Sequence, residues 1–271
     1  MNDQEYLDKL HKALKEILDH VCQICDEQGF TYFLSYGTAL GARRHKGFIP
    51  WDDDIDIVMP RDDLEAFMRY MKEHDDPDYS LQFTHNEKRY FLYFPKVRKN
   101  NTLFLEGIAE GVYQNNGIYI DIFPLEYVDE KNVKKIPRKY KILNLLKHFP
   151  RFIECRPFFK AERSRLQYLA DCIFSIPFRL MNREKYIAWL NRYMSSDGTP
   201  ETGTYLADYD TVLGLMKKEV YFPPARMEFE GTLYNVPNKI DEYLTNQYGS
   251  DFMELPPEEE RVTHAPLEVR F

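Results

Sequence analysis

The sequence predicts an α/β (α+β) fold with one core sheet, a helical middle region and a C-terminal tail that packs back on the core. The 271 residues are enough to bury a large core. Leu7, Leu10, Leu14 and Ile17 recur at three- and four-residue steps, which predicts an amphipathic helix over about the first 28 residues. Strand-like and helix-like segments then alternate, and this succession is typical of a layered α/β domain.

The first half of the chain contains the elements expected to build the sheet. Thr31–Ser35 is a short run of ring and branched side chains and predicts a buried strand. Residues 36–38 predict a turn, and residues 39–44 predict the start of a short helix. Asp54–Met59 predicts a second strand, and Asp62 is expected to cap the helix that follows.

Further elements are expected along the rest of the chain. Residues 90–98 and 117–123 predict two more strands. A helix is predicted over residues 166–190, interrupted by a proline near its middle. Short strands or turns are expected at residues 227–236, followed by a helix at residues 240–247.

The chain divides by composition into three parts, which we expect to form one continuous domain. Residues 1–128 predict a core that contains the sheet, residues 129–215 a basic helical region, and residues 216–271 a C-terminal extension. Hydrophobic residues make up 44% of the chain and charged residues 30%, as in ordinary soluble globular proteins. The net charge of −8 argues against a general nucleic-acid-binding protein, which is usually basic.

Targeting and disulfide signals are not evident in the sequence. The first residues are too charged for a signal peptide, and no apolar run reaches the length of about 18 residues that a membrane span needs. The four cysteines are too few and too scattered for a disulfide framework. We therefore expect a cytoplasmic protein.

Positive charge is concentrated in residues 131–165, where twelve Lys or Arg stand against two acids. Because the whole chain carries −8, the remainder carries −18. Leu, Ile and Phe are interleaved, so the stretch is a candidate for peripheral contact with an anionic membrane at its inner face. Two alternatives stay open: the charges pair with the acidic remainder, or they attract a phosphate-bearing acceptor.

The sharpest motif is the acidic run PWDDDIDIVM at residues 50–59. Its carboxylates repel one another unless a cation lies among them. Side chains alternate along a strand, so Asp52, Asp54 and Asp56 are expected on one face and the isoleucines on the other. Carboxylates grouped in this way predict an oxygen-ligand site for Mg²⁺ or Mn²⁺. A solvated acidic loop is the alternative interpretation.

Asp121 lies in a second strand-like segment, GIYIDIF at residues 117–123, in which the isoleucines share one face. A lone carboxylate in so apolar a strand is costly to bury unless it is paired or bound to a metal. Asp121 is therefore predicted as the third carboxylate of the site. It would either complete the metal site or accept the proton of an attacking hydroxyl, and both roles stay open.

Gly37 and Thr38 stand between a predicted strand and a predicted helix, upstream of Asp54. A glycine lets a phosphate approach the backbone, and N–H groups at the start of a helix favour an anion. A Gly-Thr pair followed by Asp-x-Asp on the next strand is typical of nucleotidyltransferases.

Two long runs, LSYGTALGARR at residues 34–44 and GFIPWDDDIDI at residues 47–57, resemble the signature of the LicD family. These are bacterial phosphocholine transferases related to the fukutin group. The resemblance extends to Lys96-Val97-Arg98, to YIDIFPL at residues 119–125 and to the tail at residues 248–257. It covers most of the chain and is weakest in the basic region.

The resemblance implies that residues 1–128 form a polymerase-β-like nucleotidyltransferase core, which is the catalytic part, and that residues 216–271 complete the site. It also implies transfer of phosphocholine from CDP-choline, or from a related CDP-alcohol donor, to a hydroxyl of a glycan, with release of CMP. A lipid-linked or polymeric cell-surface glycan, such as lipopolysaccharide or a teichoic-acid precursor, is the expected acceptor. Asp54, Asp56 and Asp121 are implied to hold Mg²⁺ or Mn²⁺, with Asp52 as a further ligand or orienting group.

Cationic groups are expected to meet the phosphates of the donor. Lys96 and Arg98 lie two apart on a predicted strand and so share a face, and Arg43 follows the Gly-Thr turn by a short helix. Arg261 and His264, in the acidic, proline-rich tail, are candidates for closing over the site. For each of them an ordinary surface position is the alternative.

Other functions remain open at this point. A nucleotidyltransferase would leave a nucleoside monophosphate on its acceptor, and a relative could transfer another CDP-linked alcohol phosphate. A non-catalytic glycan-binding relative is the third alternative. The intact carboxylates speak against it, because a protein without a reaction to catalyse has no need for a destabilising acid cluster.

Overall fold

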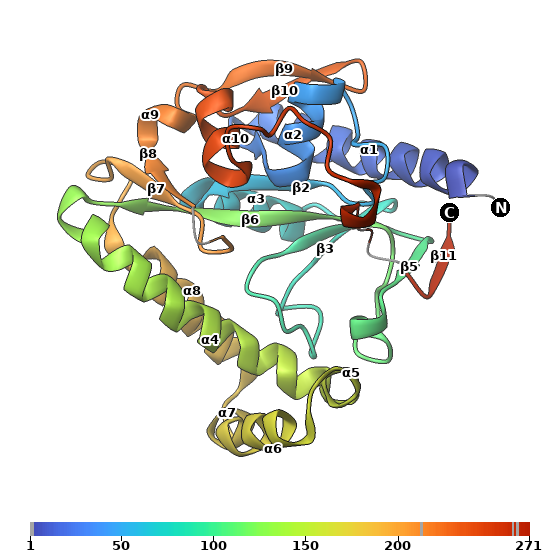
Figure 1. Cartoon of the computed structure of the whole chain (residues 1–271), viewed down its shortest axis with the longest axis vertical. Coiled ribbons are helices and arrows are strands. Elements are labelled where there is room, and N and C mark those ends of the chain that lie inside the picture. The colour runs from blue at the N-terminus through green and yellow to red at the C-terminus, as the bar shows by residue number, and fades with distance from the viewer. Residues whose placement is uncertain (1–2, 212–213, 262, 264–265) are drawn as a thin grey trace.

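A computed structural model describes residues 3–211, 214–261, 263 and 266–271 of the chain. Its centre is a curled, mixed sheet of seven strands, with helices on both sides (Figure 1). This architecture confirms the predicted α/β (α+β) fold class.

The sheet is organised around its longest strand, β6. Five strands follow the order β1–β2–β6–β4–β3: β1 (Phe33–Leu34), β2 (Asp56–Pro60), β6 (Tyr119–Val128), β4 (Lys96–Lys99) and β3 (Tyr79–Gln82). β2 runs parallel to β6, and β4 runs antiparallel to it. The far half of β6 pairs with β7 (Tyr205–Ala207), which in turn pairs with β8 (Leu215–Lys217).

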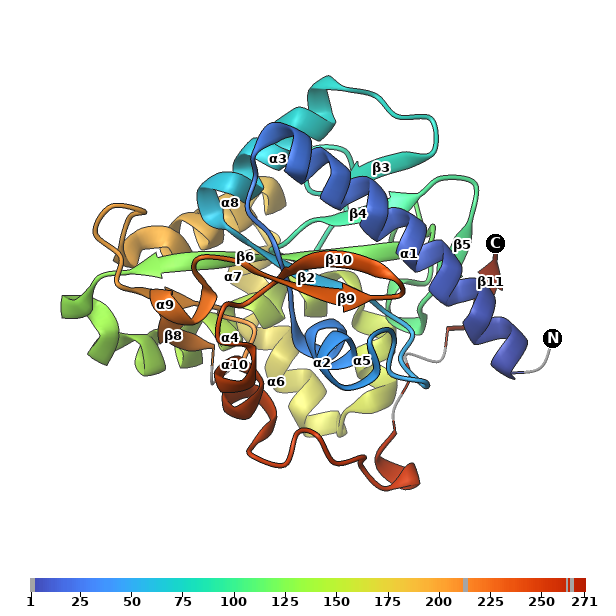
Figure 2. The same cartoon turned by 90° about the horizontal axis from the view of Figure 1, so that it is seen from above.

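Helices cover the two faces of this sheet unequally (Figures 1 and 2). One side carries α1 (Asp3–Gln28), α2 (Tyr36–His45), α9 (Lys218–Tyr221), α10 (Ile240–Tyr248) and the hairpin of β9 (Ala225–Phe229) and β10 (Thr232–Val236). The other side carries α4 (Ile136–Glu154), α5 (Arg156–Glu162), α6 (Arg165–Phe174), α7 (Ile176–Arg179) and α8 (Arg183–Met194). α3 (Arg61–Glu73) packs beside β2, β3 and β6.

Short elements complete the chain. β5 (Leu103–Leu105) pairs with β11 (Glu268–Arg270), which ties the end of the tail to the core. Four 3₁₀ turns lie in the described residues: η1 (Gly107–Ala109), η2 (Glu130–Lys135), η3 (Ser195–Asp197) and η4 (Glu258–Glu260). None of the helices formed by the described residues is both long and apolar enough to cross a bilayer.

Several predicted boundaries are confirmed and others move. α1 ends at Gln28, directly before Gly29, whose φ of 75° lies in the left-handed region. The turn expected at residues 36–38 is instead the first turn of α2, because Ala39 N already donates to Ser35 O at 3.0 Å. Asp62 lies inside the first turn of α3 rather than at its cap, where its charge still favours the helix dipole.

The strand expected at residues 90–98 is confined to Lys96–Lys99. The segment before it is irregular because its rings fill a second, smaller core between the sheet and the α4–α5 corner. Tyr90 and Phe91 pack there with Tyr113, Phe152 and Phe159. The expected helix at residues 166–190 is three helices, α6 to α8.

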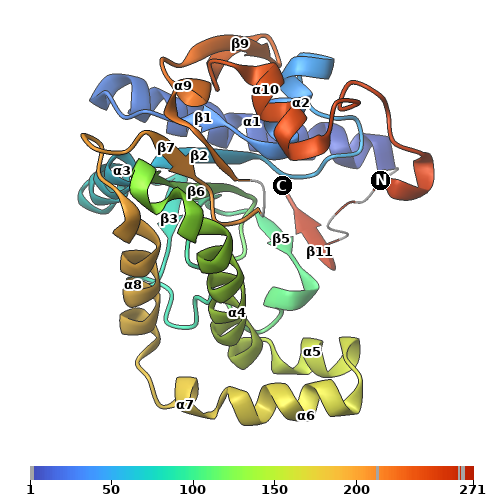
Figure 3. The same ribbon diagram turned by 60° about the vertical axis from the view of Figure 1, so that its left-hand side comes forward.

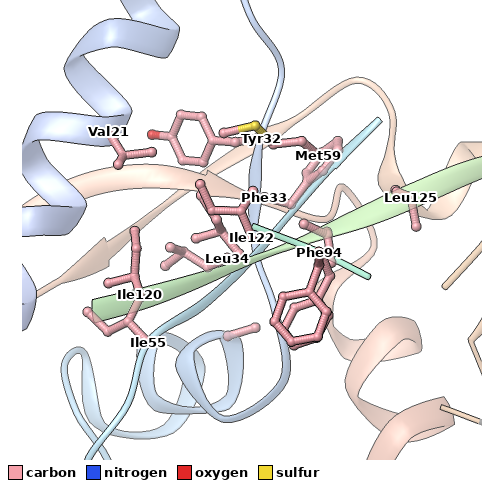
Figure 4. Close-up of a cluster of buried hydrophobic side chains, with 14 of the residues drawn as sticks. Val21, Tyr32, Phe33, Leu34, Ile55, Met59, Phe94, Ile120, Ile122 and Leu125 are labelled. Atoms are coloured by element: carbon pink, nitrogen blue, oxygen red, sulfur yellow. The ribbon is translucent and has the colours of Figure 1, made fainter. Parts of the chain in front are cut away.

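The main core is one continuous cluster at the centre of the sheet. Val21 of α1, Leu34 of β1, Met59 of β2, and Ile120 and Ile122 of β6 gather there (Figure 4). Each of the three ranges 1–128, 129–215 and 216–271 contributes some of its buried side chains to this cluster.

A buried ion pair and a hydrogen bond tie α3 and α8 to β6. Arg61, the first residue of α3, donates from Nε to Glu126 Oε1 at 3.1 Å and also donates to Asn191 of α8 at 3.0 Å. Glu126 is fully buried in β6. The pair therefore fixes the position of α3, β6 and α8 relative to one another.

Arg61→Ala should lower the free energy of unfolding by about 3–5 kcal/mol, because it leaves the buried Glu126 carboxylate without its cation. Urea denaturation at neutral pH measures this loss. Lys9→Ala is the matched control, since Lys9 pairs with Glu5 in an exposed i,i+4 contact and such pairs contribute about 1 kcal/mol or less. A loss for Arg61→Ala no larger than that of the control would contradict the assignment.

Candidate active site

Three charged side chains stand in a row across the middle of the sheet. Asp56 of β2 is paired in register with Asp121 of β6, and Asp121 is paired with Lys96 of β4. Paired residues on neighbouring strands point to the same face, and the strands lie about 4.8 Å apart. The register therefore places a carboxylate, a second carboxylate and an ammonium side by side.

The alternation predicted for the acidic segments is confirmed for Asp54, Asp56 and Asp121. It does not extend to Asp52, whose carboxylate lies beside Gly37, and β2 begins at Asp56 rather than at Asp54. Ile55 and Ile57 are fully buried, as are Ile120 and Ile122. Asp54, Asp56 and Asp121 instead line a common cavity. The apolar residues between the acids thus anchor each strand in the core, and this fixes the direction of the carboxylates.

Lys96 offsets part of the negative charge of the row. Its Nζ lies 2.7 Å from Asp121 Oδ1 and 3.0 Å from Oδ2, and it sits 3.4 Å from the centre of the Tyr119 ring. Burial raises the pKa of Asp121 to about 6, against the opposing effect of Lys96. Burial, together with the carboxylates of Asp54, Asp121 and Asp52, raises the pKa of Asp56 well above its usual range.

The row has the character of a cation site. Although Asp121 Oδ1 is buried and close to Lys96, it accepts no well-directed hydrogen bond from any residue that the structure describes. Burial first, and then the charges of the neighbouring carboxylates, raise the pKa of Asp56 against the opposing effect of Lys96. Hard divalent ions prefer such oxygen ligands. Among the described residues, no group of three or more His, Cys, Asp or Glu side chains is arranged so that it could hold a metal ion.

Gly37 and Thr38 lie behind the acid row, outside the cavity lining. Thr38 Oγ1 accepts a hydrogen bond from Asp56 N at 2.9 Å, and so holds the start of β2. A Cβ at position 37 would lie 2.7 Å from Asp52 Oδ2, so any other residue there would displace the Asp52 carboxylate. The structure thus places this pair where it positions the acids, and does not bring it to the cavity.

Two of the predicted arginines also lie away from the cavity. Arg98 is 1% exposed, donates to Gln82 Oε1 at 2.6 Å and to Gly117 O, and stacks on Tyr119 with its guanidinium 4.7 Å from the ring centre. Arg43 pairs with Asp241 at 2.8 Å on the opposite side of the sheet. Of the cations expected on β4, the structure brings Lys96 to the cavity and leaves Arg98 in the core.

The tail reaches the acidic segment through Arg261. Its guanidinium lies 4.5 Å from the centre of the Trp51 ring, next to Asp52. The carboxylate of Asp52 packs against Gly37 rather than lining the cavity. His264 lies outside the described residues.

The cavity in front of the acid row has a volume of about 670 Å³. Its opposite side is formed by α4 and α5 and is basic, with Lys147, Arg151 and Arg163. Aromatic rings line much of the remaining wall: Phe91, Tyr93, Phe94, Tyr113, Tyr119, Phe123, Phe158 and Phe159. The space thus lies between an anionic sheet and a cationic helix layer, and its walls are rich in rings.

The basic stretch at residues 131–165 therefore divides between several roles. Lys147 donates to Tyr209 O at 2.6 Å and lies 3.4 Å from Asp210, at the edge of the cavity. Lys139 is buried and pairs with Asp197. The sequence did not identify which residues of this stretch line the cavity. It showed an excess of basic residues there, but no pattern that gives their positions.

Comparison with known proteins agrees with this geometry. The family profile described as LicD/FKTN/FKRP, nucleotidyltransferase domain, matches residues 29–152. The chain is 30% identical over 258 residues to the lipopolysaccharide cholinephosphotransferase LicD of Haemophilus influenzae, which covers 92% of this chain and 91% of the relative. The chain belongs to the LicD family. As a LicD-family protein it is an enzyme, a transferase.

More distant relatives share shorter segments. The human ribitol 5-phosphate transferase FKRP is 38% identical over 53 residues, which is 20% of this chain and 11% of FKRP. An uncharacterized protein of Rickettsia prowazekii is 20% identical over 175 residues, which is 59% of this chain and 62% of the relative.

A second pair of carboxylates lies at the edge of the cavity of this LicD-family enzyme. Asp208 is buried, accepts the hydroxyl of Tyr36, and accepts Asp210 N at 2.8 Å. Asp210 lines the cavity and accepts the Tyr93 hydroxyl at 3.0 Å. Burial, and next the charge of Asp210, raise the pKa of Asp208 to about 7.

Asp208→Asn should change how stability depends on pH. In unfolded chains Asp has a pKa near 3.9, so between about pH 4 and 7 the folded protein binds more protons than the unfolded chain. Stability associated with Asp208 is therefore lost as pH rises through this window. The free energy of unfolding of Asp208→Asn, relative to that of the unsubstituted protein, should therefore rise by about 3 kcal/mol between pH 4 and 7.5.

Urea denaturation of both proteins at several pH values measures this difference. Asp62→Asn, on the exposed surface of α3, is the control and should show no comparable trend. A constant difference between Asp208→Asn and the unsubstituted protein across the range would rule out the raised pKa.

Proposed function

We propose that this LicD-family transferase moves phosphocholine from CDP-choline to a hydroxyl of a cell-surface glycan and releases CMP. One observation carries the proposal: a single cavity is lined by the carboxylates of Asp54, Asp56 and Asp121, by the basic helix wall and by aromatic rings. The name of the Haemophilus relative, a lipopolysaccharide cholinephosphotransferase, supports the same transferred group.

The charges of the cavity suit the diphosphate of such a donor. Lys147, Arg151 and Arg163 on the helix wall can bind its phosphate oxygens. Asp54 and Asp56 would hold Mg²⁺ or Mn²⁺, ions that enzymes commonly bind through one or two carboxylates together with substrate phosphates. Such an ion, when bound, neutralises charge that develops on the leaving CMP.

The residues of the row would then act on the acceptor. The hydroxyl oxygen of the glycan attacks the phosphorus next to choline, the bond to the CMP oxygen breaks, and the hydroxyl proton passes to a carboxylate. Asp121 would accept this proton or make a third contact with the metal, and its ion pair with Lys96 would hold it in position.

The aromatic lining suits the choline head. A quaternary ammonium has no hydrogen-bond donor and binds through the faces of aromatic rings. Tyr93, Phe158 and Phe159 line the cavity, and the Tyr93 hydroxyl donates to the Asp210 carboxylate at 3.0 Å. A ribitol head would instead require several hydrogen-bonding partners, which ring faces do not supply.

Asp56→Asn should lower transfer by roughly 100-fold or more while the fold is retained, because a charge that acts on the transition state is lost. Asp121→Asn should have a comparable effect. CMP release at saturating Mg²⁺ measures activity, and thermal unfolding monitors the fold. Removal of divalent ions by EDTA should abolish release in the unsubstituted enzyme, and added Mg²⁺ should restore it.

The exposed Asp62→Asn is the control for the loss of one negative charge. If Asp56→Asn keeps activity within a few-fold of Asp62→Asn, the carboxylate row is not the catalytic site.

A donor panel tests the identity of the transferred group. CDP-choline should support faster CMP release than CDP-ethanolamine, CDP-glycerol or CDP-ribitol, since ring faces favour the quaternary ammonium. Mass spectrometry of a glycan acceptor should show added phosphocholine. An added nucleotide would indicate a nucleotidyltransferase instead, and preference for CDP-ribitol would overturn the assignment of choline.

A further inference from the structure

Helices α6 and α7 carry exposed apolar side chains at the end of the molecule opposite the β9–β10 hairpin (Figures 1 and 3). None of the ten residues of α6 is buried. Leu166, Leu169 and Ile173 are spaced so that they share one face of α6. Leu166 is 79% exposed and Leu180, just after α7, is 87% exposed. The other large exposed apolar residues of the segment are Leu169, Ile173, Phe174, Ile176 and Met181.

This outward direction is fixed by contacts on the inner side of the same helices. Tyr168 and Cys172 of α6 pack against the smaller core. Phe178 of α7 stacks on Phe149 with ring centres 4.3 Å apart. Ser164 and Gln167 form a capping box at the start of α6. Because the inner side chains are held in this way, the opposite apolar faces are presented to the surroundings together.

The chain segment that carries the exposed apolar residues is rich in positive charge. Between residues 156 and 185 there are seven Lys or Arg and three Asp or Glu, whereas the rest of the chain has 29 basic and 41 acidic residues. Lys160, Arg165 and Arg179 are exposed and form no ion pair with any carboxylate of the described residues. This end is therefore apolar and basic on a molecule that is otherwise acidic.

We propose that the α6–α7 face, made of the seven exposed apolar residues named above with Lys160, Arg165 and Arg179, docks on a bilayer surface that contains anionic lipids. Helices that lie in the plane of such a surface bury apolar side chains among the lipid headgroups while their cations meet the phosphates. The acidic remainder of the chain is repelled by the same surface, which orients the protein. A second copy would bring like charges together across a twofold axis, so it fits this face less well.

The docking face lies directly beside the active-site cavity. Phe158, Phe159 and Arg163 line the cavity and immediately precede α6 in the chain. A docked enzyme would hold this wall near the lipid surface, which suits an acceptor carried on a lipid. That consequence depends on the proposed function, whereas docking itself needs neither donor nor acceptor.

The location also refines the expectation that residues 131–165 contact a membrane. Lys139 and Lys147 of that stretch are engaged inside the protein. The exposed apolar residues that such contact requires are concentrated further along the chain, in α6 and α7.

Flotation with vesicles tests the proposal on the full chain without substrates. The protein should float with phosphatidylcholine vesicles that contain about 30% phosphatidylglycerol, and hardly at all with phosphatidylcholine alone. Binding should weaken in about 0.5 M salt, because the charges are then screened. The triple variant Leu166→Ser, Phe174→Ser, Leu180→Ser should lose binding, and Arg165→Glu with Arg179→Glu should weaken it by at least about fivefold for each charge.

Leu233→Ser with Leu255→Ser is the matched control, since these exposed leucines lie on β10 and in the tail. The control should bind as the unsubstituted protein does, and all variants should keep their thermal unfolding temperature and CMP release with a water-soluble acceptor. Equal flotation of the triple variant, or no flotation of the unsubstituted protein with either vesicle, overturns the proposal. A third outcome would also overturn it: light scattering shows that the unsubstituted protein is a dimer and the triple variant a monomer, and neither binds vesicles. The face would then be an interface between two copies of the chain.

Discussion

The pairing of β2 with β6 and of β6 with β4 is the constraint on which the site depends. It places Asp56, Asp121 and Lys96 next to one another on one face of the sheet. Carboxylates in such proximity destabilise the fold through repulsion and desolvation, and the raised pKa values of Asp56 and Asp121 report that cost. The isoleucines on the opposite face offset it, because their burial in the main core holds both strands in register.

The remaining parts of the chain are arranged around this row. Thr38, near the start of α2, holds the backbone of Asp56 through a hydrogen bond. Arg98 packs on the ring of Tyr119, the same ring that Lys96 contacts. The helices after β6 return across the sheet and face the acids with cations and rings. An anionic wall and a cationic wall around one space form a favourable environment for a substrate that contains both phosphate and a cationic head.

The layer that completes the cavity also carries the apolar, basic end of the molecule. α5 contributes Phe158 and Phe159 to the cavity, and α6 begins a few residues later. The charged cavity and the exposed apolar surface therefore lie on opposite sides of this helical region. Such an arrangement keeps the two environments apart while a lipid-linked molecule could reach from one to the other.

The sequence by itself determined which face of each acidic strand carries the carboxylates, because period-two alternation needs no tertiary information: Ile55 and Ile57 between the aspartates already define which face is buried. It did not determine that β2 and β6 are neighbours, which only the sheet pairing decides. It could not decide between Lys96 and Arg98, which share a strand face, since their surroundings come from Tyr119, Gln82 and Gly117 on other strands and loops. Nor could it place the cations of α4 and α5 opposite the acids. That position depends on how a helix layer packs across a sheet, and long-range packing leaves no local pattern in the chain.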